Sequence, residues 1–172
     1  AGLSTGIVST ARITHATPAA TYAETNRRDW ESDADINPQD RNPACRDIAS
    51  QLVAWDKANG DGFELILGGG RQKFLPATAT DPEYADQKGD REDGRNLIEE
   101  WKAGASNRTF VADKAGFDAF DWNGSGQILG LFEPSHMQYD LDRNPAAEPS
   151  IAEMTLAAIK RLSKNPGGYV LM

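Results

Sequence analysis

Residues 6–19 read Gly-Ile-Val-Ser-Thr-Ala-Arg-Ile-Thr-His-Ala-Thr-Pro-Ala, and this stretch joins a strand pattern to a helix start. The apolar and β-branched residues of Gly6–Ile13 predict a strand. Thr17 is a typical N-cap residue and Pro18 suits the first position of a helix, so a short helix is predicted over Pro18–Glu24. The polar residues 29–43 contain Asp, Asn and Pro and therefore predict a loop.

The alternation of strand and helix patterns continues to the end of the chain. Apolar residues spaced three and four apart predict a helix that starts at Asn42-Pro43, carries Cys45, Ile48, Leu52 and Trp55 on one face, and ends at residues 59–62. Ser150 and Glu153 have the spacing of a capping box. The remaining strands are expected over Phe63–Leu67, Thr109–Ala112, Gln127–Phe132 and Tyr169–Met172. Helices are expected from Leu97 to a stop near Gly104, over Lys114–Phe120, and after Ser150, where Ile151, Met154, Ala158 and Leu162 line the apolar face and Asn165–Gly168 stops the helix.

This order predicts an α/β fold with helices packed on a mainly parallel sheet, in which ligands bind at the carboxyl ends of the strands. Two long stretches, residues 75–93 and 133–149, are polar with little periodicity and are expected to be irregular. Gly68-Gly69-Gly70-Arg71 follows a strand, but it lacks the Lys-Ser/Thr of a phosphate-binding loop. We interpret it as a permissive turn at the strand end.

Length and charge restrict the possible functions. A chain of 172 residues is long enough for one domain with a sizeable core. The formal net charge is -8, which disfavours nucleic acid as a partner. No apolar run approaches the length of a membrane span. The chain opens without Met, and its last predicted strand stops where a functional loop should follow, so we expect an internal piece of a longer protein.

The chain alone does not contain the residues of a usual zinc hydrolase centre. The two histidines, His15 and His136, do not form a helical metal-binding pair. Cys45 is the only cysteine. It is expected to be a buried small side chain on a helix, although half of a disulfide with a partner outside this piece is the alternative.

Nine blocks of sequence, in order along nearly the whole chain, resemble the alkaline phosphatases. The signal comes from nine blocks in the right order and not from any single block. The blocks are Gly6–Ala19, Asn26–Asp35, Ile66–Arg71, Asp81–Tyr84, Asp93–Leu97, Glu100-Trp101, Leu129–Pro134, Pro149–Thr155 and Leu162–Gly168.

The resemblance implies part of an alkaline-phosphatase-like αβα sandwich. It implies a parent enzyme that hydrolyses phosphate monoesters through a phosphoserine intermediate, with Zn²⁺ and Mg²⁺ as cofactors. It also implies a homodimer in the periplasm or outside the cell. The family's serine nucleophile and its zinc ligands would lie in the remaining segments of the parent chain. Residues 1–172 are therefore expected to be a single internal fragment that is inactive alone.

The resemblance assigns roles to three residues near the start of the chain. Arg28 falls on the arginine that clamps two phosphate oxygens, a task that suits a planar guanidinium. The count of residues from His15 selects Arg28 over its neighbour Arg27. Thr17 falls on a hydroxyl that ligates magnesium. His15 occupies a position that is His in mammalian members and Asp in some bacterial ones, near the magnesium and the phosphate.

A further calcium-type site is implied by the mammalian branch of the family. Its ligands would be the carboxylates of Glu83, Glu133 and Glu148 and the backbone carbonyl of Phe132, and oxygen-only ligation is usual for Ca²⁺. The mammalian pattern has Asp at the position of Glu148. The mammalian branch also has a disulfide at the position of Cys45. A non-catalytic module that binds divalent cations through these acidic loops is the alternative function, and solvated loop acids are the structural alternative.

Overall fold

The computed structural model describes residues 2–42, 45–59 and 62–172. Its centre is a sheet of five strands in the order β3-β4-β2-β1-β5, and all four neighbouring pairs are parallel. This confirms the prediction of an α/β fold with a mainly parallel sheet. The strands are β1 (Ser4–Arg12), β2 (Leu65–Gly69), β3 (Arg108–Val111), β4 (Gln127–Leu131) and β5 (Tyr169–Leu171).

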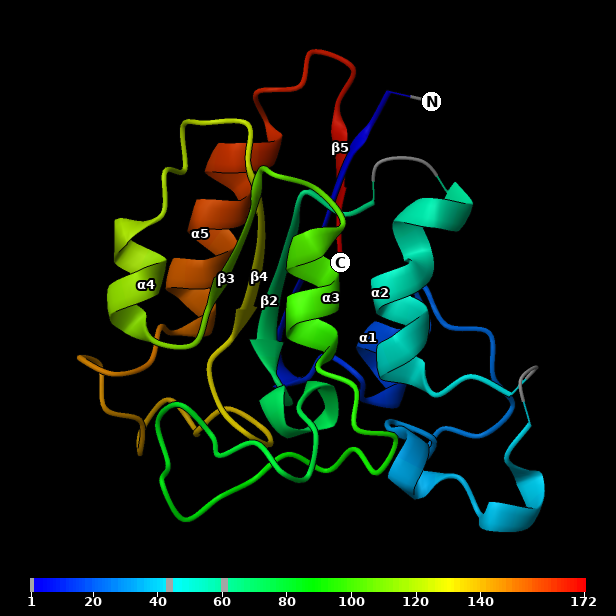
Figure 1. Ribbon diagram of the computed structural model, residues 1–172. Coiled ribbons are helices and arrows are strands. Elements are labelled where there is room, and N and C mark those ends of the chain that lie inside the picture. Colours follow the sequence, from blue (N-terminus) through cyan, green and yellow to red (C-terminus); the bar gives the residue numbers. More distant parts are fainter. Residues whose placement is uncertain (1, 43–44, 60–61) are drawn as a thin grey trace.

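Helices cover both faces of the sheet and form a three-layer sandwich (Figure 1). Alternate residues of each strand point to opposite faces, so Ile66 joins one core cluster while Leu65 and Leu67 join the other. The first cluster packs under α1 (Ala16–Ala19), α2 (Ile48–Asn59) and α3 (Leu97–Ala103), and the second under α4 (Lys114–Ala119) and α5 (Ile151–Leu162).

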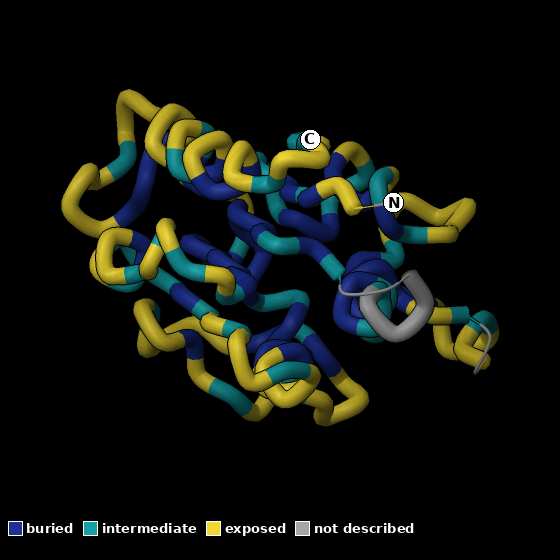
Figure 2. Tube along the Cα trace, turned by 90° about the horizontal axis from the view of Figure 1, so that it is seen from above, coloured by how far each residue is buried: buried dark blue, intermediate teal, exposed yellow. Residues whose placement is uncertain are grey.

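The interior strands β2 and β4 are buried along their whole length, and exposed residues lie on the outer helices and loops (Figure 2). Continuous burial is the usual state of parallel strands covered on both faces. No helix among the described residues is both long and apolar enough to cross a membrane.

The last helix shows the predicted capping box. The Ser150 hydroxyl accepts a hydrogen bond from the Glu153 backbone N–H at 3.1 Å, and the Glu153 carboxylate accepts one from the Ser150 backbone N–H at 2.8 Å. The apolar face of α5 buries Met154, Ala158 and Leu162. Two backbone N–H groups that have no acceptor within the helix therefore donate to the two side chains that the sequence pattern identified.

Two predicted helix starts are wrong. Helix α1 is shorter than Pro18–Glu24: it begins at Ala16 with His15 at the N-cap position, so Thr17 lies inside the helix. Turn hydrogen bonds continue beyond α1, from the backbone N–H groups of Tyr22 and Ala23 to the Ala19 carbonyl, and the buried Tyr22 hydroxyl donates a hydrogen bond to the Ile13 carbonyl at 2.9 Å.

Helix α2 begins at Ile48 and not at Asn42-Pro43, of which Pro43 lies outside the described residues. The Asp47 carboxylate accepts a hydrogen bond from the Ser50 backbone N–H at 2.9 Å, which is the geometry of a helix cap. Cys45 consequently precedes the helix and is only half-buried, so the expectation of a buried side chain on a helix is also wrong. Whether it pairs with a cysteine elsewhere stays a prediction.

The turn after β2 confirms the interpretation of the glycine run. Gly70 has φ of 96°, in the left-handed region that favours glycine. An added Cβ at Gly70 would lie 2.9 Å from the Arg12 Cβ. Gly70 therefore allows β2 to turn close to the end of β1 and directs the following residue, Arg71, into the interior.

Candidate functional site

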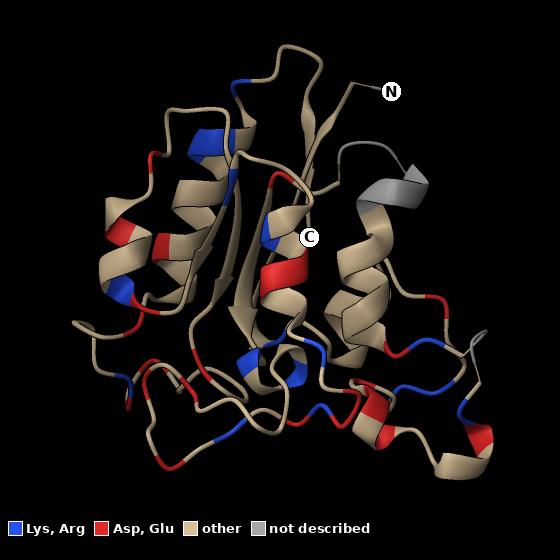
Figure 3. Cartoon of the chain, in the orientation of Figure 1, with Lys and Arg blue, Asp and Glu red and all other residues tan. Residues whose placement is uncertain are grey.

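Loops rich in charged residues gather at the carboxyl ends of the strands, the lower edge of the sheet in Figure 3. The candidate site residues all lie in segments that leave this edge. They fall into two groups, one around α1 after β1 and the other in the loops that meet after β2 and β4.

The first group contains His15, Thr17 and Arg28. His15 occupies the N-cap position of α1 without a side-chain capping bond, and Thr17 is exposed on that helix. Arg28 is exposed and lines a cavity of about 210 Å³ together with Ala16, Ala19 and other residues of the α1 segment. The structure thus places the three residues around one short helix at the end of β1. Thr17 offers a solvent-exposed hydroxyl oxygen, a type of ligand that suits Mg²⁺.

An ion pair holds the loop that carries Arg28. The Arg12 guanidinium contacts both oxygens of Glu31, at 2.8 and 2.7 Å, and the Thr14 hydroxyl donates to Glu31 at 2.6 Å. Burial alone would raise the pKa of Glu31, but the hydrogen bonds from Arg12 and Thr14 hold it below its ordinary value. The sequence pattern gave no reason to pair residues 12 and 31.

His136 joins this group from the opposite loop, and sequence reasoning did not assign it to the site. Its ring lies edge-on to the His15 ring with 5.4 Å between centroids. Its Nε2 lies 2.8 Å from the Arg12 guanidinium. Burial and the neighbouring Arg12 charge lower the pKa of His136, which favours its neutral form. The only signal in the sequence was that His136 is one of two histidines.

The second group contains Glu83, Phe132, Glu133 and Glu148. Glu133 and Glu148 are buried, and the contact of Glu148 with Glu133 is close enough to perturb its titration. Burial and then the Glu133 carboxyl raise the pKa of Glu148 to about 7. Its Oε1 atom is buried without a hydrogen-bond partner among the described residues. A buried oxygen of this kind is costly and fits a cation as its missing partner.

Glu83 and Phe132 flank this carboxylate pair without completing a metal cluster. The Glu83 carboxylate is ion-paired with Arg71 at 2.6 Å, and burial raises the pKa of Glu83. Phe132 is buried at the end of β4, immediately before Glu133. Across the described ranges, no three His, Cys, Asp or Glu side chains stand as a ready metal-binding group.

Two further residues organise the second group, and sequence reasoning missed them. Arg71 is fully buried and contacts Asp81 through two hydrogen bonds of 2.8 Å each. Tyr84 donates a hydrogen bond from its hydroxyl to Glu133 at 2.9 Å. Burial and this bond raise the pKa of Tyr84 to about 12. Tyr84 appeared in the sequence only as a member of a family block, and Arg71 as a member of another block and as the end of the glycine turn.

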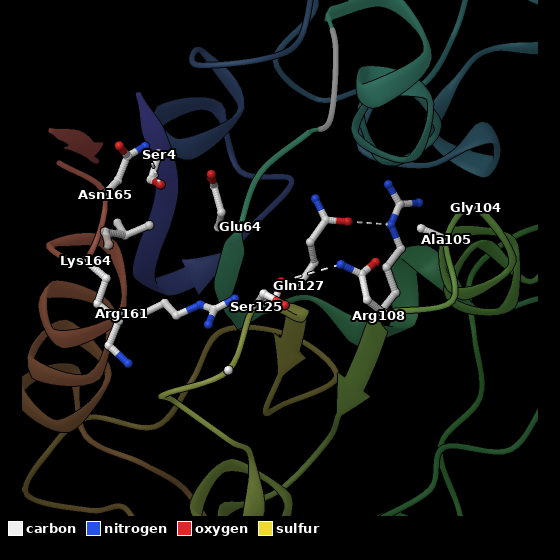
Figure 4. A pocket seen from close by; sticks show the side chains of 13 residues that line it. Ser4, Glu64, Gly104, Ala105, Arg108, Ser125, Gln127, Arg161, Lys164 and Asn165 are labelled. Atoms are coloured by element: carbon white, nitrogen blue, oxygen red, sulfur yellow. Dashed lines mark hydrogen bonds between the residues drawn. The ribbon is translucent and has the colours of Figure 1, made fainter. Parts of the chain in front are cut away.

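A cavity of about 540 Å³ opens at the opposite edge of the sheet (Figure 4). It is lined by residues at the amino-terminal ends of β1, β3 and β4 and near the end of α5, including Ser4, Arg108, Gln127 and Arg161. None of the predicted site residues lines it. Its place, away from the carboxyl ends of the strands, separates it from the candidate site.

Comparison with known proteins identifies the family. The family model for alkaline phosphatase matches residues 1–172. The tissue-nonspecific alkaline phosphatase of Felis catus is 44% identical over 177 residues, covering 99% of this chain and 33% of the relative. The membrane-bound alkaline phosphatase of Bombyx mori is 43% identical, covering 99% of this chain and 31% of the relative. The chain thus spans about a third of the length of the curated relatives it matches.

Solved structures agree with this result. The alkaline phosphatase of Thermus thermophilus aligns with a TM-score of 0.68 and 28% identity, covering 99% of this chain and 28% of that chain. A TAB5 alkaline phosphatase mutant with Mg bound in its M3 site aligns at 0.66 with 20% identity, covering 99% of this chain and 38% of that chain, which supports the fold alone. The family model, the relatives and the sheet topology agree, and the chain belongs to the alkaline phosphatase family.

Proposed function

We propose that this chain is the phosphate-binding segment of a parent alkaline phosphatase that hydrolyses phosphate monoesters through a phosphoserine intermediate. The observation that carries the proposal is the grouping of His15, Thr17 and Arg28 around α1 in a chain of this family. Arg28 binds two phosphate oxygens and stabilises the charge that develops on them. His15 lies beside the bound phosphate.

Metal chemistry in the parent divides between this chain and the remaining segments. Thr17 supplies a hydroxyl oxygen for Mg²⁺, a hard cation that takes oxygen ligands. Zn²⁺ is held by segments outside residues 1–172. When bound, these ions lower the pKa of water and offset negative charge on the phosphate. What this chain does itself is orient the phosphate through Arg28, on a loop held by Arg12 and Glu31.

The proposal predicts different activities for the parent enzyme and for the isolated chain. The 172-residue chain alone should not hydrolyse a generic phosphomonoester such as p-nitrophenyl phosphate, because the nucleophile and zinc ligands lie elsewhere in the parent. The parent with Zn²⁺ and Mg²⁺ should hydrolyse it and lose activity on chelation. Turnover by the isolated chain, with intact enzyme excluded by mass spectrometry, would contradict this division of labour.

The family resemblance also supports a homodimeric parent that works in the periplasm or outside the cell. Sedimentation of the parent checks the first point, and fractionation of the source cells checks the second. A monomer in sedimentation, or a parent confined to the cytoplasm, would contradict the respective proposal.

A second function, binding of a divalent cation, is favoured by the unpartnered Glu148 oxygen beside Glu133. We propose Ca²⁺ as the ion, with Glu83, Glu133, Glu148 and the Phe132 carbonyl as ligands. For Glu83 to ligate, its carboxylate must share or leave the ion pair with Arg71. Calorimetric titration with Ca²⁺ should show binding that Glu133→Ala abolishes. The absence of binding heat in the unsubstituted protein would end this proposal.

A further inference from the structure

The loop Asp81–Tyr84 is fixed to the sheet by one buried arginine. Arg71 holds Asp81 through two hydrogen bonds and also donates to the Leu131 carbonyl at 2.6 Å. Asp81 in turn accepts hydrogen bonds from the backbone N–H groups of Glu83 and Tyr84, at 2.9 and 3.1 Å. The loop is therefore tied to the end of β4, from which Phe132 and Glu133 continue.

This anchoring aims the Tyr84 hydroxyl at a single atom. It donates to Oε1 of Glu133 at 2.9 Å, and Glu133 is 7% exposed. A tyrosine hydroxyl has one proton to donate, so it binds one carboxylate oxygen and leaves the other for a different partner. The bond restricts rotation of the Glu133 carboxylate group about the bond that joins it to the rest of the side chain.

The orientation of the Glu133 carboxylate matters because Glu148 lies beside it. Glu148 is 3% exposed, and its Oε1 has no hydrogen-bond partner among the described residues. Its other oxygen accepts a weak bond from the Gln138 backbone N–H at 3.3 Å. A cation between Glu133 and Glu148 needs one oxygen from each carboxylate directed at the same point, and long Glu side chains lose rotamer freedom when they are held there.

We infer that Tyr84 is a positioning residue for the cation site, and that its hydroxyl holds the Glu133 carboxylate in the orientation that ligates the ion. The inference rests on the proposed cation site. Hydrogen bonds that orient metal ligands typically account for about 10–100-fold in metal affinity. Tyr84→Phe removes the hydroxyl and keeps the ring, so it isolates this contribution.

The experiment uses the protein that carries this chain and compares it with Tyr84→Phe and Tyr139→Phe. Tyr139 is the matched control because it is 83% exposed and lies in a loop outside the proposed ligand set. Two quantities are measured: the Ca²⁺ dissociation constant by calorimetry, and the number of waters on bound Tb³⁺ from its luminescence lifetimes in H₂O and D₂O. Tb³⁺ is excited directly, so that the loss of a tyrosine chromophore does not affect the measured luminescence.

Tyr84→Phe should raise the Ca²⁺ dissociation constant at least about tenfold and increase the water count on Tb³⁺, while Tyr139→Phe leaves both unchanged. A role in folding alone would lower thermal stability and leave affinity and water count as they were, and that result would overturn the inference. If the unsubstituted protein binds neither Ca²⁺ nor Tb³⁺, the proposed cation site itself fails, which is a different outcome.

Discussion

Arg12 and Glu31 form a bidentate ion pair, with nitrogen–oxygen distances of 2.8 and 2.7 Å, that joins the end of β1 to the loop carrying Arg28. The side chains are 19% and 9% exposed. Backbone bonds from Ile48 to Trp30 and from Ala49 to Glu31 continue the connection into α2. The loop that presents Arg28 is therefore held from two sides, by β1 and by α2.

Glu31→Gln tests this connection, because it keeps the side-chain shape and removes the charge. Leaving Arg12 without its buried counter-charge should lower the free energy of unfolding by about 1–3 kcal/mol. In the intact enzyme it should also weaken inhibition by inorganic phosphate, because the Arg28 loop is held less firmly. Denaturant unfolding and phosphate inhibition are the measurements. Glu24→Gln, at an exposed position in the same segment, is the control, and equal behaviour of the two variants would refute the connection.

The lowered pKa values of Glu31 and Asp93 predict acid destabilisation. For Asp93, burial opposes the shift, but hydrogen bonds from the Arg91 side chain and the Arg95 backbone lower the pKa. Because Glu31 and Asp93 are protonated more readily in the unfolded chain than in the native state, their contribution to stability is full above the unfolded pKa values near 4. It should fall as the pH drops through the native values.

Urea unfolding midpoints measured between pH 6 and pH 3 test whether stability falls as the pH drops. Asp93→Asn should make the decline shallower, since one of the carboxylates with a lowered pKa no longer titrates. A midpoint that stays constant or rises in acid would show that these carboxylates do not determine the acid stability.

Ser150→Ala tests the cap of α5. The substitution leaves the Glu153 backbone N–H without its side-chain acceptor and should lower the free energy of unfolding by about 0.5–2 kcal/mol. Ser163→Ala, at the exposed other end of the same helix, should change it by less than about 0.5 kcal/mol. Denaturant unfolding of both variants gives the comparison, and a larger effect at Ser163 would contradict the role of the capping box.

Periodicity predicted the regular elements well because it reports on burial. Every predicted strand matches an observed strand within two residues at either end, and α5 has the predicted cap and apolar face. The predicted start of α2 was wrong because a tertiary contact places its cap. Asp47 caps the helix while also pairing with the fully buried Arg91.

The candidate site depended on contacts between residues that no local pattern connects. Residues 75–93 read as a polar insertion, yet they contain Arg91, which is 1% exposed, and Asp81, which binds Arg71. Tyr84 and Glu133 are 49 residues apart in the chain. Such pairs form where loops from different strands meet at one edge of a sheet, so they follow from topology and cannot be found from spacing.

The most direct test of the account replaces each arginine of the Arg27-Arg28 pair in the intact enzyme. Removing a group that stabilises the transition-state charge typically costs on the order of 100-fold in rate. Arg28→Ala should therefore lower kcat/KM for a phosphomonoester by about 100-fold and weaken phosphate inhibition in parallel, while Arg27→Ala should leave both nearly unchanged. A larger loss in Arg27→Ala, or unchanged kinetics in Arg28→Ala, would contradict the assignment of Arg28 to phosphate.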